Sequence, residues 1–197
     1  MLFRSVRAMK HSATREFFAY WDGKRAGEAA PERGDLQPEA VRHLLGDIFV
    51  LSYDRKAGFP FRVAGTRLCA LLGGDAKATS FADLFTSASR NEFEDVVGIV
   101  AEESLATVAG ITAEGADGST VHLELLLLPF STQSHAPLSL TGLVVPIGRD
   151  DAHAYAPLKN FTLTSWRHAG EAQKWTGPRN INKWSVMRGL TVYEGLR

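Results

Sequence analysis

The sequence predicts an α+β fold in which helices cover one face of a five-stranded antiparallel sheet. Runs of β-branched and aromatic residues occur in two groups, a pair within residues 48–64 and three more within residues 105–147. Short turns separate the strands of each group, and such turns can join only antiparallel neighbours. Helical periodicity occupies the start of the chain and the stretch between the two groups. The predicted order is therefore two helices, two strands, two helices and three strands.

The chain opens with two predicted helices. Ser12 or Thr14 can cap the first, because a hydroxyl there accepts a hydrogen bond from a free backbone N–H, and Gly27 ends it. Pro38 suits the first position of the second helix, where no N–H partner is needed, and Gly46 suits its carboxyl end.

A hairpin and a helical stretch follow. Residues 48–53 and 59–64 are the two strands, and the residues between them have turn composition. Residues 66–72 predict a short helix. Two capping boxes, at residues 80–83 and 89–92, then predict helix starts, and the second opens a longer amphipathic helix.

The last three strands are expected at about 105–113, 120–128 and 138–147. The middle strand carries apolar residues at every second position: Val121, Leu123, Leu125 and Leu127. A period of two places this set on the covered face and His122 and Glu124 on the opposite face.

Composition excludes several classes of protein. The 197 residues include 22 Lys and Arg and 22 Asp and Glu, and 45% of residues are hydrophobic, which is too apolar for a disordered chain. No stretch approaches the roughly 20 apolar residues of a membrane span. The single cysteine, Cys69, excludes an intrachain disulfide framework and a cysteine-based zinc site.

The zero net charge is an average over two unequal parts. Residues 1–148 hold 14 Lys and Arg against 18 Asp and Glu, a net charge of −4, and residues 149–197 hold 8 against 4, a net charge of +4. Attraction between body and tail, within or between chains, is one hypothesis for this balance. Four parts follow: a basic extension at 1–8, N-terminal helices at 9–46, a core at 47–148 and a basic, tryptophan-rich tail at 149–197.

The first residues lack the apolar core of a signal peptide, so we expect a cytoplasmic protein. Either Met1 or Met9 can be the start, since the first helix signals come just after Met9. The basic tail interleaves tryptophans with cations, so a nucleic-acid arm is an alternative, but it lacks a dense basic block. We expect it to fold back on the body or to dock on a protein.

Catalytic signatures are missing. The sequence has no G-x-S-x-G elbow, no P-loop and no G-x-G-x-x-G after a strand, and its six histidines are dispersed. Cys69 sits among leucines, where a small buried hydrophobe is the simpler interpretation and a reactive thiol the alternative. We therefore predict a protein that is not an enzyme and holds no metal. An enzyme using Cys69 or His122 in the interior is the alternative.

Several ordered motifs resemble one known family. They are MKHSATREFFAYW at 9–21, APERGDLQP at 30–38, FRVAGT at 61–66 and LLLLP at 125–129. Together they resemble a bacterial, mostly alphaproteobacterial, family of stand-alone PAS-domain proteins (PAS_5-like). The resemblance spans about residues 9–148. The matching motif residues, taken as structural or docking positions, are Trp21, Pro31, Arg33, Asp35, Pro38, Arg62, Gly65 and Thr66.

The resemblance implies a PAS fold and a sensory or regulatory role in signalling, exerted on a protein partner. It also implies a ligand space between sheet and helices. Our candidate lining residues are Phe49, Leu51, Phe61, Val63, Phe81, Leu84, Phe85, Leu123, Leu125 and Leu127. Core packing is the alternative for most of them.

Many PAS domains dimerise through N-terminal helices, so Phe17, Phe18 and Trp21 are candidates for a homodimer face. Covering their own sheet is the alternative; the two are not exclusive, and helix spacing does not separate them. Arg33 and Asp35 either contact a ligand or partner, or bond locally within their loop.

Known cofactors of PAS domains are disfavoured. The surroundings of Cys69 do not match the N-C-R-F-type motif of flavin-binding photosensors, and residues 89–104 contain no histidine that could be an axial haem ligand. An unidentified small organic ligand, or no ligand, remains.

Overall fold

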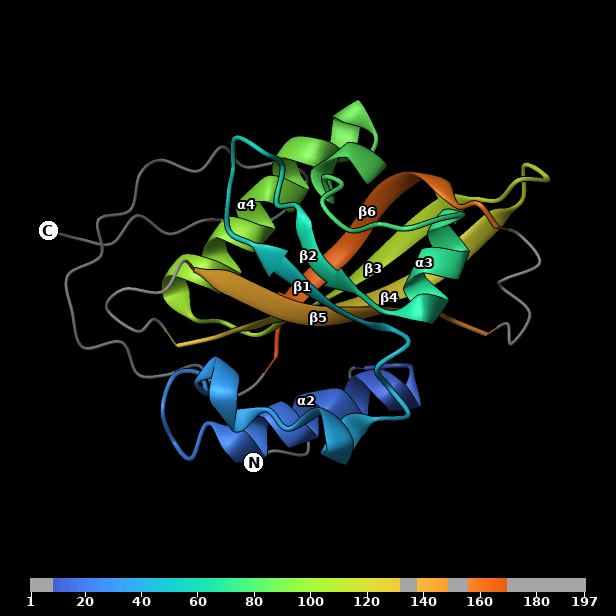
Figure 1. The fold of residues 1–197 in the computed structure, drawn as a ribbon. Helices are drawn as coiled ribbons and strands as arrows, with labels where there is room; N and C mark the ends of the chain where they lie inside the picture. The colour runs from blue at the N-terminus through green and yellow to red at the C-terminus, as the bar shows by residue number, and fades with distance from the viewer. Residues whose placement is uncertain (1–8, 132–137, 149–155, 170–197) are drawn as a thin grey trace, which may run out of the picture.

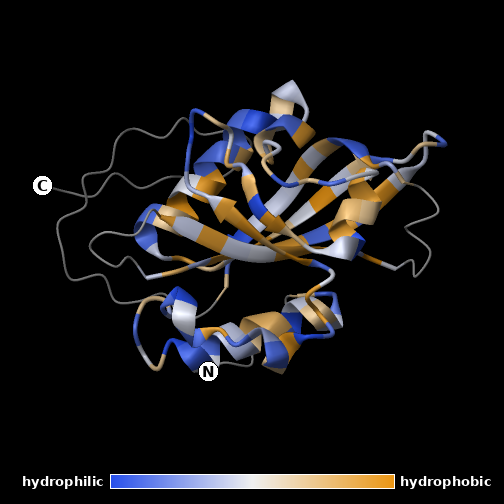
Figure 2. Ribbon diagram, viewed as in Figure 1, coloured by the Kyte–Doolittle hydropathy of each residue, from blue (hydrophilic) through white to orange (hydrophobic). Residues whose placement is uncertain are grey.

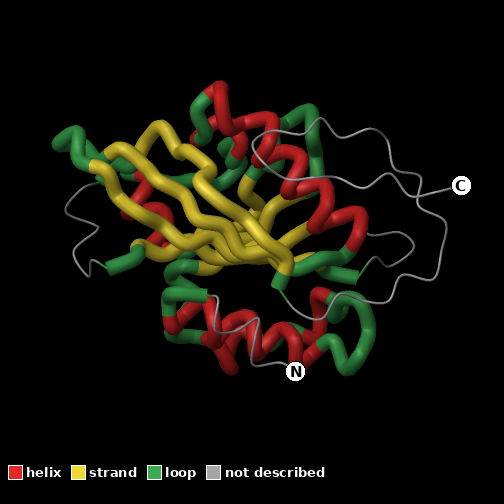
Figure 3. The backbone as a smooth tube through the Cα atoms, turned by 180° about the vertical axis from the view of Figure 1, so that it is seen from behind, coloured by secondary structure: helices red, strands yellow, loops and turns green. Residues whose placement is uncertain are grey.

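The computed structural model describes residues 9–131, 138–148 and 156–169. Three layers are stacked (Figure 1), with the sheet in the middle, α3 and α4 on one side and α2 on the other. The same layers are seen from behind in Figure 3. We call the α4 side of the sheet the inner face and the α2 side the outer face. The helices are α2 (Ser12–Lys24), η1 (Arg33–Asp35), η2 (Pro38–Val41), α3 (Thr66–Leu72), η3 (Ala82–Leu84) and α4 (Ser87–Glu103).

All five predicted strands are present, and a sixth joins them. The strands are β1 (Ile48–Ser52), β2 (Phe61–Ala64), β3 (Thr107–Glu114), β4 (Thr120–Pro129), β5 (Ser139–Pro146) and β6 (Lys159–His168). They form one antiparallel sheet in the order β2-β1-β5-β4-β3-β6. Because β6 pairs with β3, the predicted boundary at residue 148 cuts through the sheet, and part of the predicted tail belongs to the fold.

The central strand β4 is covered on both faces. Leu123, Leu125 and Leu127 lie in the inner core with α4, as the alternation predicted. Leu126 and Leu128 lie in a second core with α2. Figure 2 shows hydrophobic residues along the strands and on the helices packed against the sheet. The sheet therefore has no open face along β4, although only one covered face was predicted.

The N-terminal helix begins one residue earlier than the predicted caps allow. His11 is the N-cap, and its Nδ1 accepts a hydrogen bond from the N–H of Ala13 at 3.2 Å. The second predicted helix is a single 3₁₀ turn, η2. After η2 the backbone continues in tight turns. The N–H of Leu44 donates to the Val41 carbonyl and the N–H of Asp47 to the Leu44 carbonyl, and these bonds span three residues instead of the four of an α-helix.

The two predicted capping boxes have different outcomes. Ser80 accepts a hydrogen bond from the N–H of Asp83 at 3.1 Å, which is one of the two bonds of the predicted box, but the N-cap of η3 is Phe81. Ser89 does not cap α4, because the helix already begins at Ser87. Its buried hydroxyl oxygen instead accepts a hydrogen bond from the N–H of Leu163 at 3.1 Å and so binds α4 to β6.

Candidate functional site

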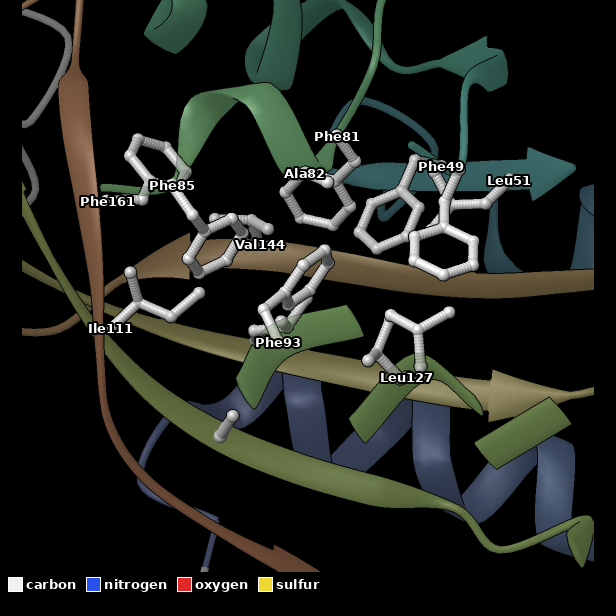
Figure 4. Close-up of a cluster of buried hydrophobic side chains, with 14 of the residues drawn as sticks. Phe49, Leu51, Phe81, Ala82, Phe85, Phe93, Ile111, Leu127, Val144 and Phe161 are labelled. Carbon is white, nitrogen blue, oxygen red and sulfur yellow. The ribbon is translucent and has the colours of Figure 1, made fainter. Parts of the chain in front are cut away.

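The space between the sheet and α4 is filled by phenylalanine rings (Figure 4). Phe81 is central, with ring centroids 4.9 Å from Phe61 and Phe93, 5.3 Å from Phe49 and 5.7 Å from Phe85. Phe85 and Phe93 stack at 4.0 Å. Figure 4 shows these rings converging from the sheet, η3 and α4. We call this set, with Phe59 and Phe161, the phenylalanine cluster.

Most of the predicted pocket residues belong to this interior. Eight of them are buried in the inner core: Phe49, Leu51, Phe61, Phe81, Phe85, Leu123, Leu125 and Leu127. Leu84 is partly buried at its margin. They pack against one another, and whether they also line a ligand site stays a prediction.

Val63 is a wrong prediction, because its side chain is 50% exposed. Leu51 pairs with Phe61 and Val50 pairs with Val63, so Arg62 is an extra residue without a counterpart on β1. Such a bulge reverses the alternation of sides along the strand. Val63 therefore lies opposite Val50 instead of following Phe61 into the interior.

On the outer face, α2 is bound to β4 at both ends. The carboxylate of Glu124, only 4% exposed, accepts hydrogen bonds from the backbone N–H of Lys10 at 2.7 Å and of His11 at 2.9 Å. At the other end, the indole N–H of Trp21 donates to the carbonyl of Pro129 at 2.9 Å. Ten helical residues span about 15 Å and five strand residues about 17 Å, so the two anchor pairs match in length and α2 lies along β4.

The predicted dimer face is buried inside this layer. Phe17, Phe18 and Trp21 are 2%, 1% and 3% exposed and pack with the outer-face leucines of β4. Their use as a free dimer surface is therefore wrong for this conformation. The alternative, that they cover their own sheet, is the arrangement observed.

The motif residues of the first loop act locally. The carboxylate of Asp35 accepts a hydrogen bond from the N–H of Glu32 at 2.8 Å, which is the local bonding left open above. The carbonyl of Pro31 accepts from the N–H of Ser131, just after β4, while Arg33 is exposed. Pro38 opens η2.

The remaining motif residues lie where the outer layer meets α3. Gly65 is the N-cap of α3, and Thr66 is its first residue. A Cβ on Gly65 would lie 2.2 Å from the carbonyl oxygen of Leu45, so only glycine permits this approach. Arg62 is the exposed bulge residue of β2.

A chain of polar contacts links the inner and outer layers at the same place. The guanidinium of Arg67, on α3, binds both carboxylate oxygens of Asp47, at 2.8 and 2.5 Å, and the carbonyl of His43 at 2.7 Å. The hydrogen bond that Arg67 donates to the Asp47 carboxylate raises the pKa of Arg67 above its usual value. His43 in turn lies 2.8 Å from Glu16 of α2. Asp47 and Glu124 are the buried carboxylates of the described residues, and both anchor the outer layer.

Groups that could support catalysis do not converge in the described part of the chain. Cys69 is partly buried, with its Sγ 3.8 Å from the carbonyl oxygen of Ala64, and His122 is exposed on β4. Among described residues, no three His, Cys, Asp or Glu side chains gather as a metal site would require.

The interior also fits a flavin poorly. An isoalloxazine ring needs polar side chains that pair with its nitrogen and oxygen atoms. The buried side chains of the inner core are apolar except Ser89, whose hydroxyl oxygen already accepts from the N–H of Leu163, and the polar atoms at its margin belong to Tyr53, Cys69 and Trp166. We therefore assign no step to a flavin.

A protein-family comparison matches residues 9–145 to the PAS_5 model, described as a PAS domain. A search of curated proteins finds no match. Among the described residues, no helix has the length and apolar character needed to cross a membrane.

Solved structures with a similar arrangement are distant in sequence. One is a light-oxygen-voltage domain studied with a flavin analogue (15% identity, 59% of this chain and 88% of that chain, TM-score 0.45). Others are the LOV protein of Rhodobacter sphaeroides (13%, 57% and 67%, 0.44) and the PAS domain of an HTR-like protein from Haloarcula marismortui (20%, 55% and 90%, 0.42). The first concerns flavin, which the sequence disfavours. At these identities and TM-scores the likeness assigns no cofactor to this chain, and its cofactor stays open.

Proposed function

The chain belongs to the PAS_5 family of PAS domains, and from this premise we propose a sensory and regulatory module that acts on a protein partner without catalysis of its own. The observation that carries the proposal is the fastening of α2 over the outer face of the sheet. Trp21 and Glu124 hold the ends of this helix to one strand, and the helix covers apolar residues that a partner could bind instead.

Binding at the interior would reach α2 through β4. Leu125 and Leu127 of this strand pack in the phenylalanine cluster, while Glu124, Leu126 and Leu128 hold or contact the outer layer. A shift of β4 that widens the inner space therefore moves the anchor of α2. A ligand that binds the protein more tightly when β4 is shifted than when it is not will favour the shifted state. The fraction of molecules with α2 docked then changes according to that difference in affinity. An apolar organic molecule suits this largely apolar interior.

Affinity capture from the encoding organism tests the role of α2. The wild-type chain is compared with E124Q, which weakens the anchor of α2. The matched control is E94Q, which makes the same chemical change at a partly exposed carboxylate of α4. We expect specific partner proteins whose recovery changes at least threefold with E124Q and not with E94Q. Equal recovery with all three chains would remove α2 from the mechanism, and native mass spectrometry of the isolated chain would report a bound small molecule.

A further inference from the structure

The side of α4 that faces away from the sheet, which we call the outer side of α4, carries excess negative charge. This helix contains five carboxylates and one basic residue, Arg90. Four carboxylates of this helix are exposed: Glu92, Asp95, Glu102 and Glu103. The last turn has no basic residue, although the carboxyl end of a helix attracts cations.

In the described part of the chain, few basic side chains lie near these carboxylates. Arg90 is bound on the flank, 2.6 Å from Asp83 and 3.1 Å from Glu94. Arg55 lies over the helix at Gly98 and comes within 3.6 Å of Glu102. Arg55 therefore pairs with one of these four carboxylates, Glu102, and lies near a second, Asp95.

Strand β6 already runs along α4 and leads the chain to the end of this helix. The N–H of Thr86, before α4, donates to the carbonyl of Phe161 at 2.9 Å. Further along, the indole N–H of Trp166 donates to Glu92 at 3.1 Å. The N–H of Ala169 then donates to the carbonyl of Ala106, three residues beyond α4, at 2.7 Å. The described chain thus ends at Ala169, near the carboxyl end of α4.

The sequence that follows, outside the described residues, has the opposite charge. Residues 172–193 contain four basic residues and no Asp or Glu. The basic residues are Lys174, Arg179, Lys183 and Arg188, and Trp175 and Trp184 lie among them.

We propose that residues 174–188 of this chain turn back and cover the outer side of α4, with Lys174 near its carboxyl end and Arg188 near Glu92. The segment begins five residues after Ala169, so its first cation can reach Glu102 and Glu103 within the roughly 17 Å that five extended residues span. The fourteen residues after Lys174, up to Arg188, when extended, span more than the length of α4, which is about 25 Å. The short connection keeps the effective concentration of the segment high, so modest charge attraction suffices. This contact extends the existing α4–β6 interface and does not depend on the proposed function.

Zero-length cross-linking with a carbodiimide tests the proposal in the full-length chain, because the reagent joins only a lysine and a carboxylate in direct contact. We expect links from Lys174 or Lys183 to the α4 carboxylates, with a severalfold lower yield in 0.5 M salt than at low salt, since the pairs are exposed. The variant D95K/E103K should lower the yield to the remaining carboxylates at least threefold. Adding K174E/K183E to it should restore cross-linking, now with the two charges exchanged.

The matched control is E28K/E39K, which makes the same change of net charge at exposed positions away from α4. It should leave the yield unchanged. The proposal is overturned by an absence of links to α4 or by an equal loss in the control. Mixing ¹⁴N- and ¹⁵N-labelled chains also tests it, because links found only between differently labelled chains would assign the contact to a second copy.

Discussion

The anchor of α2 gives the most direct quantitative prediction. In E124Q the amide oxygen still accepts from one of the two backbone N–H groups, but the amide NH₂ group then faces the other donor. Glu124 is 4% exposed, so water cannot satisfy the lost partner. The loss of charge assistance and one unsatisfied buried donor together cost about 2–3 kcal/mol. For a folded region of this size the midpoint of thermal unfolding should fall by roughly 5–10 °C.

Urea unfolding and hydrogen exchange of the intact chain measure this effect. The control E94Q loses a partly exposed ion pair with Arg90, which is worth less than about 0.5 kcal/mol. In E124Q the backbone amides of α2 should exchange faster while those of α4 keep their protection. A loss no larger than in E94Q would refute the anchoring argument. So would a large loss with equal acceleration in both helices, because Glu124 would then support the whole fold instead of α2.

Three other predictions follow from the packing. F93A removes a ring from the centre of the phenylalanine cluster and should cost about 3–5 kcal/mol, whereas V63A, at a half-exposed bulge, should cost well under 1 kcal/mol in the same urea titration. G65A places a Cβ against the Leu45 carbonyl and should destabilise the protein by more than 2 kcal/mol. G23A, in α2, meets nothing within 4 Å and should stabilise the protein by about 0.5–1 kcal/mol. A G23A protein less stable than G65A would contradict both predictions. Partial burial lowers the pKa of His168 below 6.5 although Glu103 opposes this, so the native state resists protonation. The stability that His168 contributes above pH 6.5 should therefore be lost as the pH falls. An NMR titration midpoint at or above 6.5, or an unchanged acid loss of stability in H168Q, would disprove this.

The sequence predicts the sheet well where burial enforces a period of two. Leu123, Leu125 and Leu127 alternate because one side of β4 faces α4. Strand β6 escaped prediction because it is an edge strand with only Phe161 and Leu163 buried, and two apolar positions amid exposed ones make a weak pattern.

The outer layer was harder to predict because its contacts are non-local. Glu124 bonds residues 113 and 114 positions away, and nothing near it in the sequence distinguishes a buried carboxylate from a solvated one. The helix pattern of Phe17 and Trp21 shows an apolar side but not what covers it. The error at Val63 came from a single bulge residue, since a shift of one residue exchanges the two sides of a strand.

The pairing of α2 with β4 has a consequence during synthesis of the chain. The helix leaves the ribosome first, but Pro129, which accepts the bond from Trp21, follows more than 100 residues later. At 5–20 residues per second this delay is on the order of 5–20 s. Throughout it, the side of the helix that carries Phe17, Phe18 and Trp21 has no sheet to cover. The nascent chain therefore presents an aromatic helix that chaperones can bind, and α2 is expected to dock late, after the strands have paired.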